Sequence, residues 1–300
     1  MAKMSSSFRR SLEPEEVLSL VGDARAAALM RALGLVSKGG GASADARRKI
    51  KQITHFARQL IPAFEDVFSR HEEPVIVDAA AGKSYLGLFL YERFMREAGK
   101  GTLVLIEQRE DLVERLRELV ASLGYERVEV RHGSIESVPW PERVHIVVAL
   151  HACDTATDAA LVAAHAAKAD YLAVVPCCQA EVSRQLAELP PSAVSTLWGV
   201  SWHRREFGAH LTNVLRALAM RSHGYQITVT ELAGWEHAVK NELLLGRRVG
   251  RFHRAAQEEL DALLEQIPVQ PALLAPLLKP DGGISETRSE GSGTDAPTEA

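Results

Sequence analysis

The sequence contains few cysteines and no long apolar run. Only three of its 300 residues are cysteine, and this odd number argues against a disulfide framework and for a reducing compartment. No uncharged apolar stretch reaches the roughly 18 residues that a transmembrane helix requires. Arg9 and Arg10 near the start are followed by no apolar segment, so no secretory signal is predicted. We therefore expect a cytoplasmic protein that does not bind membranes.

The formal net charge of −4 is unevenly distributed. Residues 281–300 contain five acidic residues and one basic residue, which leaves the rest of the chain formally neutral. Because the rest of the chain is formally neutral, its overall charge does not indicate any class of binding partner. The apolar fraction of 46% and the charged fraction of 25% exclude collagen-like, mucin-like and wholly disordered proteins.

The chain divides into segments of different texture. Helical spacing over residues 13–36 is followed by a glycine-rich stretch that is typical of a mobile connector. A second helical pattern follows, and Pro62 is expected to kink or split it. The predicted organisation is an N-terminal helix with its connector, a helical cap, a large α/β domain and a disordered acidic tail, over residues 1–45, 46–72, 73–270 and 271–300.

The large domain alternates short apolar runs with helical patterns. Five such runs lack polar alternation: PVIVDAA, GTLVLIEQ, RVEVRHG, RVHIVVALHAC and DYLAVVPCC. Continuous apolar strands separated by helices indicate a parallel sheet that is covered on both faces. Two further strands are expected in YQITVTELAG and ELLLGRRV, before a final helix over residues 251–266. The predicted fold is α/β, with a doubly wound, mostly parallel seven-stranded sheet.

The turn after the first strand, VIVDAAAGKSYLG, is built from small residues. Ligands of open parallel sheets bind at the carboxyl ends of the strands, where small residues let a ligand approach the backbone. A dinucleotide is disfavoured because GxGxxG is absent. Gly82-Lys83-Ser84 looks like the end of a P-loop, although Val77 occupies the first glycine position and Asp78 would repel phosphates. A nucleotide hydrolase therefore remains an alternative, as does a turn that serves packing alone.

The same turn resembles motif I of class I S-adenosylmethionine-dependent methyltransferases, an acidic residue followed by small residues at alternate positions. Those positions are Asp78, Ala80, Gly82 and Ser84, so two of the three glycines of the motif are replaced. The resemblance implies a Rossmann-like methyltransferase fold and a carboxylate, Asp78, near the cationic groups of the cofactor. Lys83 is expected beside the cofactor in the same turn.

The next two strand ends extend the cofactor prediction. Glu107 ends the second strand and can accept hydrogen bonds from both ribose hydroxyls, with Gln108 beside it. A solvated acid that begins a helix is the alternative reading of Glu107. Gly133 and Ser134 follow the third strand, where this fold usually contacts adenine.

The fourth and fifth strands end in LHACDTATD and VPCCQ. Together with the turn, these segments resemble one branch of the class I methyltransferases over roughly residues 47–248. That branch includes bacterial proteins named only as S-adenosylmethionine-dependent methyltransferases and the eukaryotic acceptor-stem tRNA 2′-O-methyltransferase. Asp154 stands where the tRNA enzyme has glycine. The resemblance implies methyl transfer to RNA, either tRNA or rRNA.

The histidine and cysteine residues at these strand ends allow several kinds of chemistry. His151, Cys153, Cys177 and Cys178 could form a zinc site, but adjacent cysteines rarely both reach one ion, and we expect no metal. The other possibilities are a nucleophilic Cys177, buried apolar cysteines, or a polar pocket lining. A hydroxyl acceptor would need a proton acceptor, so the candidate catalytic residues are His151, Asp154 and Cys177.

Basic residues and aromatic residues give separate support for an RNA substrate. Arg204 and Arg205 lie between Trp202 and Phe207, which could stack on bases. The candidate substrate-binding residues are Lys51, Cys178, Arg204, His210 and Lys240. We expect an RNA-modifying transferase that needs no obligate protein partner. A noncatalytic RNA-binding module on the same fold is the second alternative.

Overall fold

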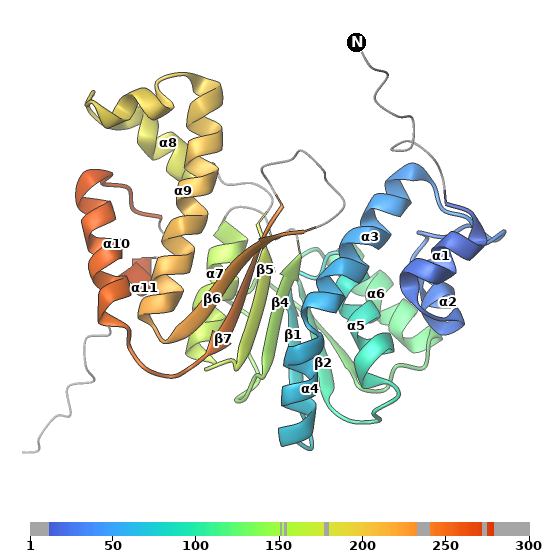
Figure 1. Cartoon of the computed structure of the whole chain (residues 1–300). Helices are drawn as coiled ribbons and strands as arrows, with labels where there is room; N and C mark the ends of the chain where they lie inside the picture. The colour runs from blue at the N-terminus through green and yellow to red at the C-terminus, as the bar shows by residue number, and fades with distance from the viewer. Residues whose placement is uncertain are drawn as a thin grey trace, which may run out of the picture.

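A central sheet of seven strands organises the computed structural model, which describes residues 12–150, 152, 155–176, 180–232, 241–271 and 275–278 (Figure 1). The strands lie in the order β3-β2-β1-β4-β5-β7-β6. Their bounds are β1 Val75–Ala79, β2 Thr102–Glu107, β3 Val128–His132, β4 Ile146–Leu150, β5 Tyr171–Val175, β6 Tyr225–Glu231 and β7 Glu242–Arg248. The order reverses between β1 and β4, which both pair with parallel neighbours. The predicted doubly wound, mostly parallel sheet is confirmed.

The last two strands close one edge of the sheet. β7 pairs antiparallel with β5 on one side and with β6 on the other. Val174 is opposite Leu244, so the start of β7 lies beside the carboxyl end of β5. β7 is therefore the only antiparallel strand among the described ones, and its first residue reaches the edge at which the parallel strands end.

Helices cover both faces of the sheet. Their bounds are α1 Pro14–Val21, α2 Ala24–Ala32, α3 Ala44–Gln59, α4 Ile61–Arg70, α5 Tyr85–Leu90, α6 Glu110–Ser122, α7 Thr155–Ala166, α8 Glu181–Glu188, α9 Ser201–Ser222, α10 Arg254–Gln266 and α11 Ala275–Leu278. A π-helical turn, Tyr91–Met95, continues α5, and a 3₁₀ turn, Val194–Trp198, precedes α9.

Two apolar layers follow from the alternation of side chains along each strand. Ile76, Leu103 and Leu105 pack into a core with residues of the helices α1 to α6. The alternate residues of the same strands, such as Val77 and Val104, face the other side of the sheet and pack with α7, α8, α9 and α10. Figure 1 shows these two groups of helices on either side of the sheet. Because both faces are buried, the strands have the continuous apolar sequences from which they were predicted.

The N-terminal region differs in part from its prediction. The helix expected over residues 13–36 is two helices, broken at Gly22, whose φ of 100° is left-handed, and restarted by the Asp23 side chain, which caps α2. The connector is not loose: Leu12 and Ala42 exchange backbone hydrogen bonds of 2.8 and 3.0 Å. The predicted break near Pro62 is confirmed, because α3 ends at Gln59 and α4 begins at Ile61.

The predicted tail also begins too early. Residues 275–278 form the short helix α11, and Leu277 is buried against the core. A disordered segment starting at residue 271 is therefore wrong for these four residues. Across the described ranges, no helix combines the length and the apolar character needed to cross a membrane.

Candidate functional site

The turn after β1 adopts left-handed backbone conformations at alternate positions. Ala80, Gly82 and Ser84 have φ values of 64°, 58° and 50°. Glycine adopts this conformation without strain, whereas a side chain with a Cβ makes it unfavourable. These three positions are those at which motif I has glycine. The sequence therefore departs from the motif while the backbone keeps the conformation that the motif's glycines favour.

Replacing Ala80 by glycine should stabilise the protein. The substitution relieves the left-handed strain, and we expect a gain of about 0.5–1 kcal/mol in the free energy of unfolding. Ala81→Gly is the matched control, since Ala81 does not have a positive φ. In that control the free energy of unfolding should fall by about 0.5–1 kcal/mol, because glycine there only increases the conformational entropy of the unfolded chain. Urea denaturation of both variants provides the measurement, and equal effects would contradict the strain argument.

Asp78 lies beneath this turn and is almost completely buried. Its Oδ2 accepts hydrogen bonds from the backbone N–H of Gly87 at 3.1 Å and from the Ser84 hydroxyl at 3.5 Å. Burial raises the pKa of Asp78 to about 7, and the negative charge of Glu107 contributes to the rise. A Cβ on Gly87 would come within 2.6 Å of the same Oδ2, so only glycine at this position allows the contact. Asp78 thus fixes the start of α5.

Glu107 connects the second strand to the turn. Its Oε2 accepts a hydrogen bond from Gly82 N–H at 2.7 Å, and its Oε1 accepts one from Arg109 N–H at 2.9 Å. The backbone carbonyl of Glu107 also accepts a hydrogen bond from Gly133 N–H at 3.0 Å. One residue therefore joins the ends of β1, β2 and β3. A carboxylate held in this way has further lone pairs with which to accept ligand hydroxyls.

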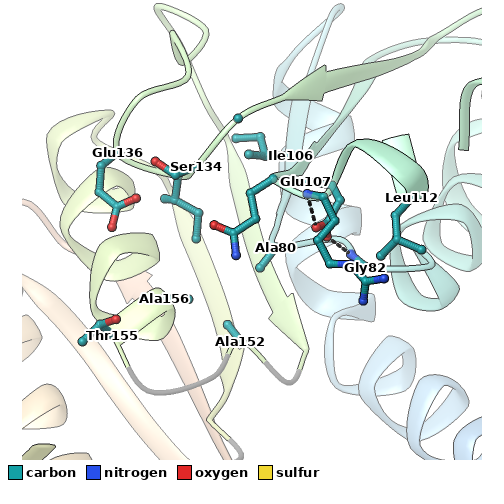
Figure 2. A pocket seen from close by; sticks show the side chains of 14 residues that line it. Ala80, Gly82, Ile106, Glu107, Leu112, Ser134, Glu136, Ala152, Thr155 and Ala156 are labelled. Atoms are coloured by element: carbon teal, nitrogen blue, oxygen red, sulfur yellow. Dashed lines mark hydrogen bonds between the residues drawn. The ribbon is translucent and has the colours of Figure 1, made fainter. Parts of the chain in front are cut away.

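These three strand ends line a cavity of about 490 Å³ (Figure 2). In Figure 2, Glu107 and Gly82 lie on one side of the cavity, and Glu136 and Thr155 lie on the other. Ile106, Leu112 and Ile135 supply apolar surface. A volume of this size is within the range of small-molecule sites, about 300–1,000 Å³. The acidic anchor, the apolar lining and the exposed backbone of the turn together fit an adenosine-containing cofactor.

Most of the predicted cofactor residues line this cavity, but three do not. Those in the lining are Ala80, Gly82, Glu107, Gln108, Gly133 and Ser134. Asp78 and Ser84 are buried beneath the turn, and Lys83 is exposed, so these three are absent from the lining. Asp78 therefore supports the turn, and its contact with the cofactor stays a prediction.

Sequence reasoning missed several lining residues. Arg109, Glu136, Thr155 and Ala156 belong to the cavity wall. Each lies within four residues of a position that the strand ends had already indicated. The signal that could have found them is simple adjacency, because residues following a parallel strand share its carboxyl edge.

The predicted catalytic residues His151, Asp154 and Cys177 lie outside the described residues, as do Cys178 and Lys240. Their roles stay predictions. Of the other candidates, Lys51 lies half-buried on α3, and Arg204 lies near the start of α9. His210 lies farther along α9 and pairs with Glu242, the first residue of β7, at 3.2 Å between Nδ1 and Oε1.

One buried ion pair beside the cavity was not predicted. Asp158, in the motif that follows β4, accepts a hydrogen bond from Arg216 Nε at 2.6 Å, and both side chains are at least 98% buried. Arg216 also donates to the Asn213 side chain at 3.0 Å. The pair joins α7 to α9, and α7 begins with the cavity residue Thr155. The last aspartate of the motif therefore has a structural partner 58 residues away.

A polar cluster at the opposite, amino edge of the sheet could suggest a metal site. One ligand atom each of His71, His145 and Asp170 lies within 4.8 Å of the others. However, Nδ1 of His145 accepts a hydrogen bond from Val75 N–H at 2.9 Å, so neutral His145 carries its proton on Nε2. Asp170 is already paired with Arg143 at 2.6 Å. The contacts therefore favour a structural cluster over a cation site.

This cluster should make the protein less stable in mild acid. Burial, and to a smaller extent the positive charges of His71 and Arg143, lower the pKa of His145 to about 4. An unfolded histidine has a pKa of about 6.5. Between these two values the unfolded chain binds more protons, so the free energy of unfolding falls as the pH falls through that window.

His145→Asn should remove this dependence. We expect wild type to lose about 1–2 kcal/mol more than the variant between pH 7 and pH 4, allowing for solvent screening. The measurement is urea denaturation of both proteins at the two pH values. Groups that titrate in both proteins cancel when the free energy of unfolding of the variant is subtracted from that of wild type. If this subtracted value is the same at pH 7 and pH 4, the role given to His145 is wrong.

Comparison with known proteins gives one family match. The model of a family described as "Methyltransferase domain" matches residues 48–185. No curated protein matches the sequence. Every residue of the cavity wall, from Ala80 to Ala156, falls within the family match.

Solved structures resemble the chain at low identity. An rRNA methylase from Streptococcus thermophilus is 12% identical, with a TM-score of 0.39 over 61% of this chain and 92% of its own. A SAM-dependent methyltransferase from Aquifex aeolicus is 15% identical, with a TM-score of 0.39 over 64% of this chain and 88% of its own. A fibrillarin pre-rRNA processing protein from Methanococcus jannaschii is 13% identical, with a TM-score of 0.39 over 60% of this chain and 68% of its own.

Proposed function

We propose that the protein is an S-adenosylmethionine-dependent methyltransferase and that its methyl acceptor is RNA. When bound, the cofactor supplies a methyl group on a positively charged sulfur, which is already activated for transfer. The protein must then align the acceptor with that methyl group and keep water out. The cavity at the ends of β1, β2 and β3 is the proposed cofactor site, with Glu107 as the ribose anchor.

One surface of α9 supports the RNA acceptor. Trp202 is 59% exposed, and the guanidinium of Arg205 lies 5.4 Å from the centre of its ring. In the turn before α9, the buried Trp198 stacks on Phe207 of α9 with 5.2 Å between ring centres. A large exposed indole beside a cation is suited to stacking on an unpaired base. Arg204, in the same turn, can contact the backbone phosphates.

The direction of α9 brings this surface to the edge of the sheet at which the parallel strands end. Ser222, the last residue of α9, precedes β6, which starts at the amino edge. His210 contacts Glu242 at the carboxyl edge. Trp202 lies eight residues earlier, so it projects about 12 Å beyond that edge at 1.5 Å per residue. An RNA chain held there passes over the edge at which the cofactor cavity opens.

The P-loop alternative fits the turn and cavity less well. A P-loop needs Lys83 to reach phosphates, yet Lys83 is exposed and outside the cavity, while the acid Glu107 holds the turn. Calorimetry distinguishes a methyltransferase from a P-loop nucleotide hydrolase. S-adenosylhomocysteine should bind, and ATP with Mg²⁺ should not; the reverse would overturn the assignment of the cavity.

The decisive test is methyl transfer itself. Total RNA from cells that lack the gene is incubated with the protein and methyl-labelled S-adenosylmethionine, and the labelled nucleotide is then mapped. We expect label in RNA, with a loss of at least 10-fold in Trp202→Ala. Phe252→Ala is the matched control, because Phe252 is 49% exposed beyond the opposite end of α9. RNA binding without label would favour a noncatalytic module, and label found only in protein would contradict an RNA acceptor.

A further inference from the structure

A histidine and a glutamate form a hydrogen bond at the edge of the sheet at which the parallel strands end. Nδ1 of His210 lies 3.2 Å from Oε1 of Glu242. A carboxylate can only accept a hydrogen bond, so Nδ1 is the donor and carries the ring proton. In neutral His210 this leaves Nε2 as an acceptor. The side chain of His210 is 63% exposed, so a reacting group can approach the ring from solvent.

The glutamate is itself held in place. Its Oε2 accepts a hydrogen bond from the Asn213 side chain at 2.7 Å, and Asn213 is in turn held by Arg216 at 3.0 Å. Arg216 ends this chain of contacts on Asp158, at the start of α7. Each link from Asn213 onward is buried. The orientation of His210 is thus connected to the helix whose first residues, Thr155 and Ala156, line the cofactor cavity.

The register and strand order place the pair two strands away from the strand end that leads into that cavity. Leu244 is opposite Val174, so Glu242 lies beside Pro176, just past the end of β5. β5 separates β7 from β4, whose carboxyl end leads to the cavity residue Ala152. At about 4.8 Å between strands, β7 lies about 10 Å from β4. A nucleotide that reaches into the cavity from the side of Trp202 would lie between the two.

We propose that His210 is the proton acceptor for methyl transfer and that Glu242 is its positioning residue. The proposal rests on the proposed function, since it requires an acceptor group that carries a proton, such as an RNA hydroxyl. In the step, the acceptor oxygen forms a bond to the methyl carbon, and the bond from that carbon to sulfur breaks. The electron pair of the broken bond stays on sulfur, which becomes neutral. The proton of the hydroxyl moves to Nε2 of His210, and the resulting imidazolium is stabilised by the carboxylate of Glu242.

Two further acidic groups lie near the pair, and Arg216 places one positive charge behind it through Asn213. Glu231 is opposite Glu242 in the β6–β7 register, and Glu206 precedes His210 by one helical turn on α9. Both would stabilise a cationic ring. The Glu242→Gln variant therefore removes one of several negative charges, and its matched control is Glu231→Gln, which keeps the contact between His210 and Glu242.

The kinetic test uses the full-length protein, methyl-labelled cofactor and the RNA preparation described above. His210→Ala should lower kcat at least 100-fold while S-adenosylhomocysteine still binds normally. Imidazole added to the buffer should restore part of the rate, because the site is open to solvent. The matched control is His203→Ala, an exposed histidine on the same helix, which should keep the wild-type rate and should not respond to imidazole. Full activity in His210→Ala, or a loss that imidazole does not restore, overturns the proposal.

The role of Glu242 has its own readout. In Glu242→Gln kcat should fall while the KM for RNA and the binding of S-adenosylhomocysteine stay close to wild type, because Nδ1 of His210 loses the acceptor that fixes its proton, whereas Glu231→Gln should keep the wild-type kcat. A wild-type kcat in Glu242→Gln overturns the role of Glu242 as a positioning residue.

A measurement without RNA separates this proposal from the proposed function. Nitrogen NMR of the labelled protein should show neutral His210 protonated on Nδ1 in wild type, with that preference lost in Glu242→Gln. If neutral His210 in wild type carries its proton on Nε2, the proposed pairing of His210 with Glu242 is wrong, whether or not RNA is methylated. If wild type labels no RNA, the proposed function fails, and the NMR result still decides the geometry of the pair.

Discussion

Glu107→Ala should weaken the binding of S-adenosylhomocysteine at least 100-fold. The carboxylate is expected to accept hydrogen bonds from the ribose, and it also holds the backbone N–H groups of Gly82 and Arg109 at 2.7 and 2.9 Å. Its removal takes away the ligand contact and leaves two donors of the turn without their acceptor. A hydrogen bond to a charged group contributes about 1.5–3 kcal/mol, so losing more than one accounts for the expected effect.

Two further variants sharpen this measurement. Glu107→Gln keeps one carbonyl oxygen but presents an amide N–H₂ to the second backbone donor, so it should also bind weakly. Glu110→Ala is the matched control, because Glu110 is exposed in the first turn of α6 and absent from the cavity wall. Calorimetry at one salt concentration gives the dissociation constants. Normal affinity in Glu107→Ala would mean that the cofactor does not bind in this cavity.

Asp158→Ala should destabilise the protein by about 3–5 kcal/mol. The substitution leaves the guanidinium of Arg216 buried without the carboxylate that accepts its Nε–H at 2.6 Å. Removing one partner of a buried pair is costly because the other charge remains in a poorly solvated site. Replacing both residues by apolar ones, as in Asp158→Leu with Arg216→Met, should cost less than Asp158→Ala alone.

An exposed pair provides the control for this prediction. Arg221 and Glu259 lie 3.2 Å apart, and their side chains are 39% and 56% exposed. Glu259→Ala should change the free energy of unfolding by less than about 1 kcal/mol, as is usual for surface pairs. Chemical denaturation of the three variants gives the comparison. A loss in Asp158→Ala no greater than that in Glu259→Ala would show that the buried pair does not hold α7 against α9.

The cofactor half of the site followed from local sequence. Apolar runs predicted the strands, and the small residues after Asp78 predicted the turn, because each signal depends only on neighbours in the chain. The place of Glu107 at the end of its strand then followed from the rule that parallel strands share a carboxyl edge. Six predicted residues therefore line the same cavity.

The acceptor half did not follow in this way. His210 was predicted to bind the substrate, but its partner Glu242 is 32 residues away on a strand whose place beside β5 no local pattern indicates. Asp158 was visible only as part of a motif, and its partner lies on a helix that is separated from it by β5 and α8.

The sequence by itself determined the alternation of strands and helices, the glycine-bearing turn and the acidic anchor at the end of β2. Only the tertiary structure decided that β7 lies between β5 and β6, that α11 packs on the core, and which polar side chains meet. The physical reason is that hydrophobic periodicity depends on the local geometry of the chain, whereas the pairing of buried polar groups depends on how distant elements pack together.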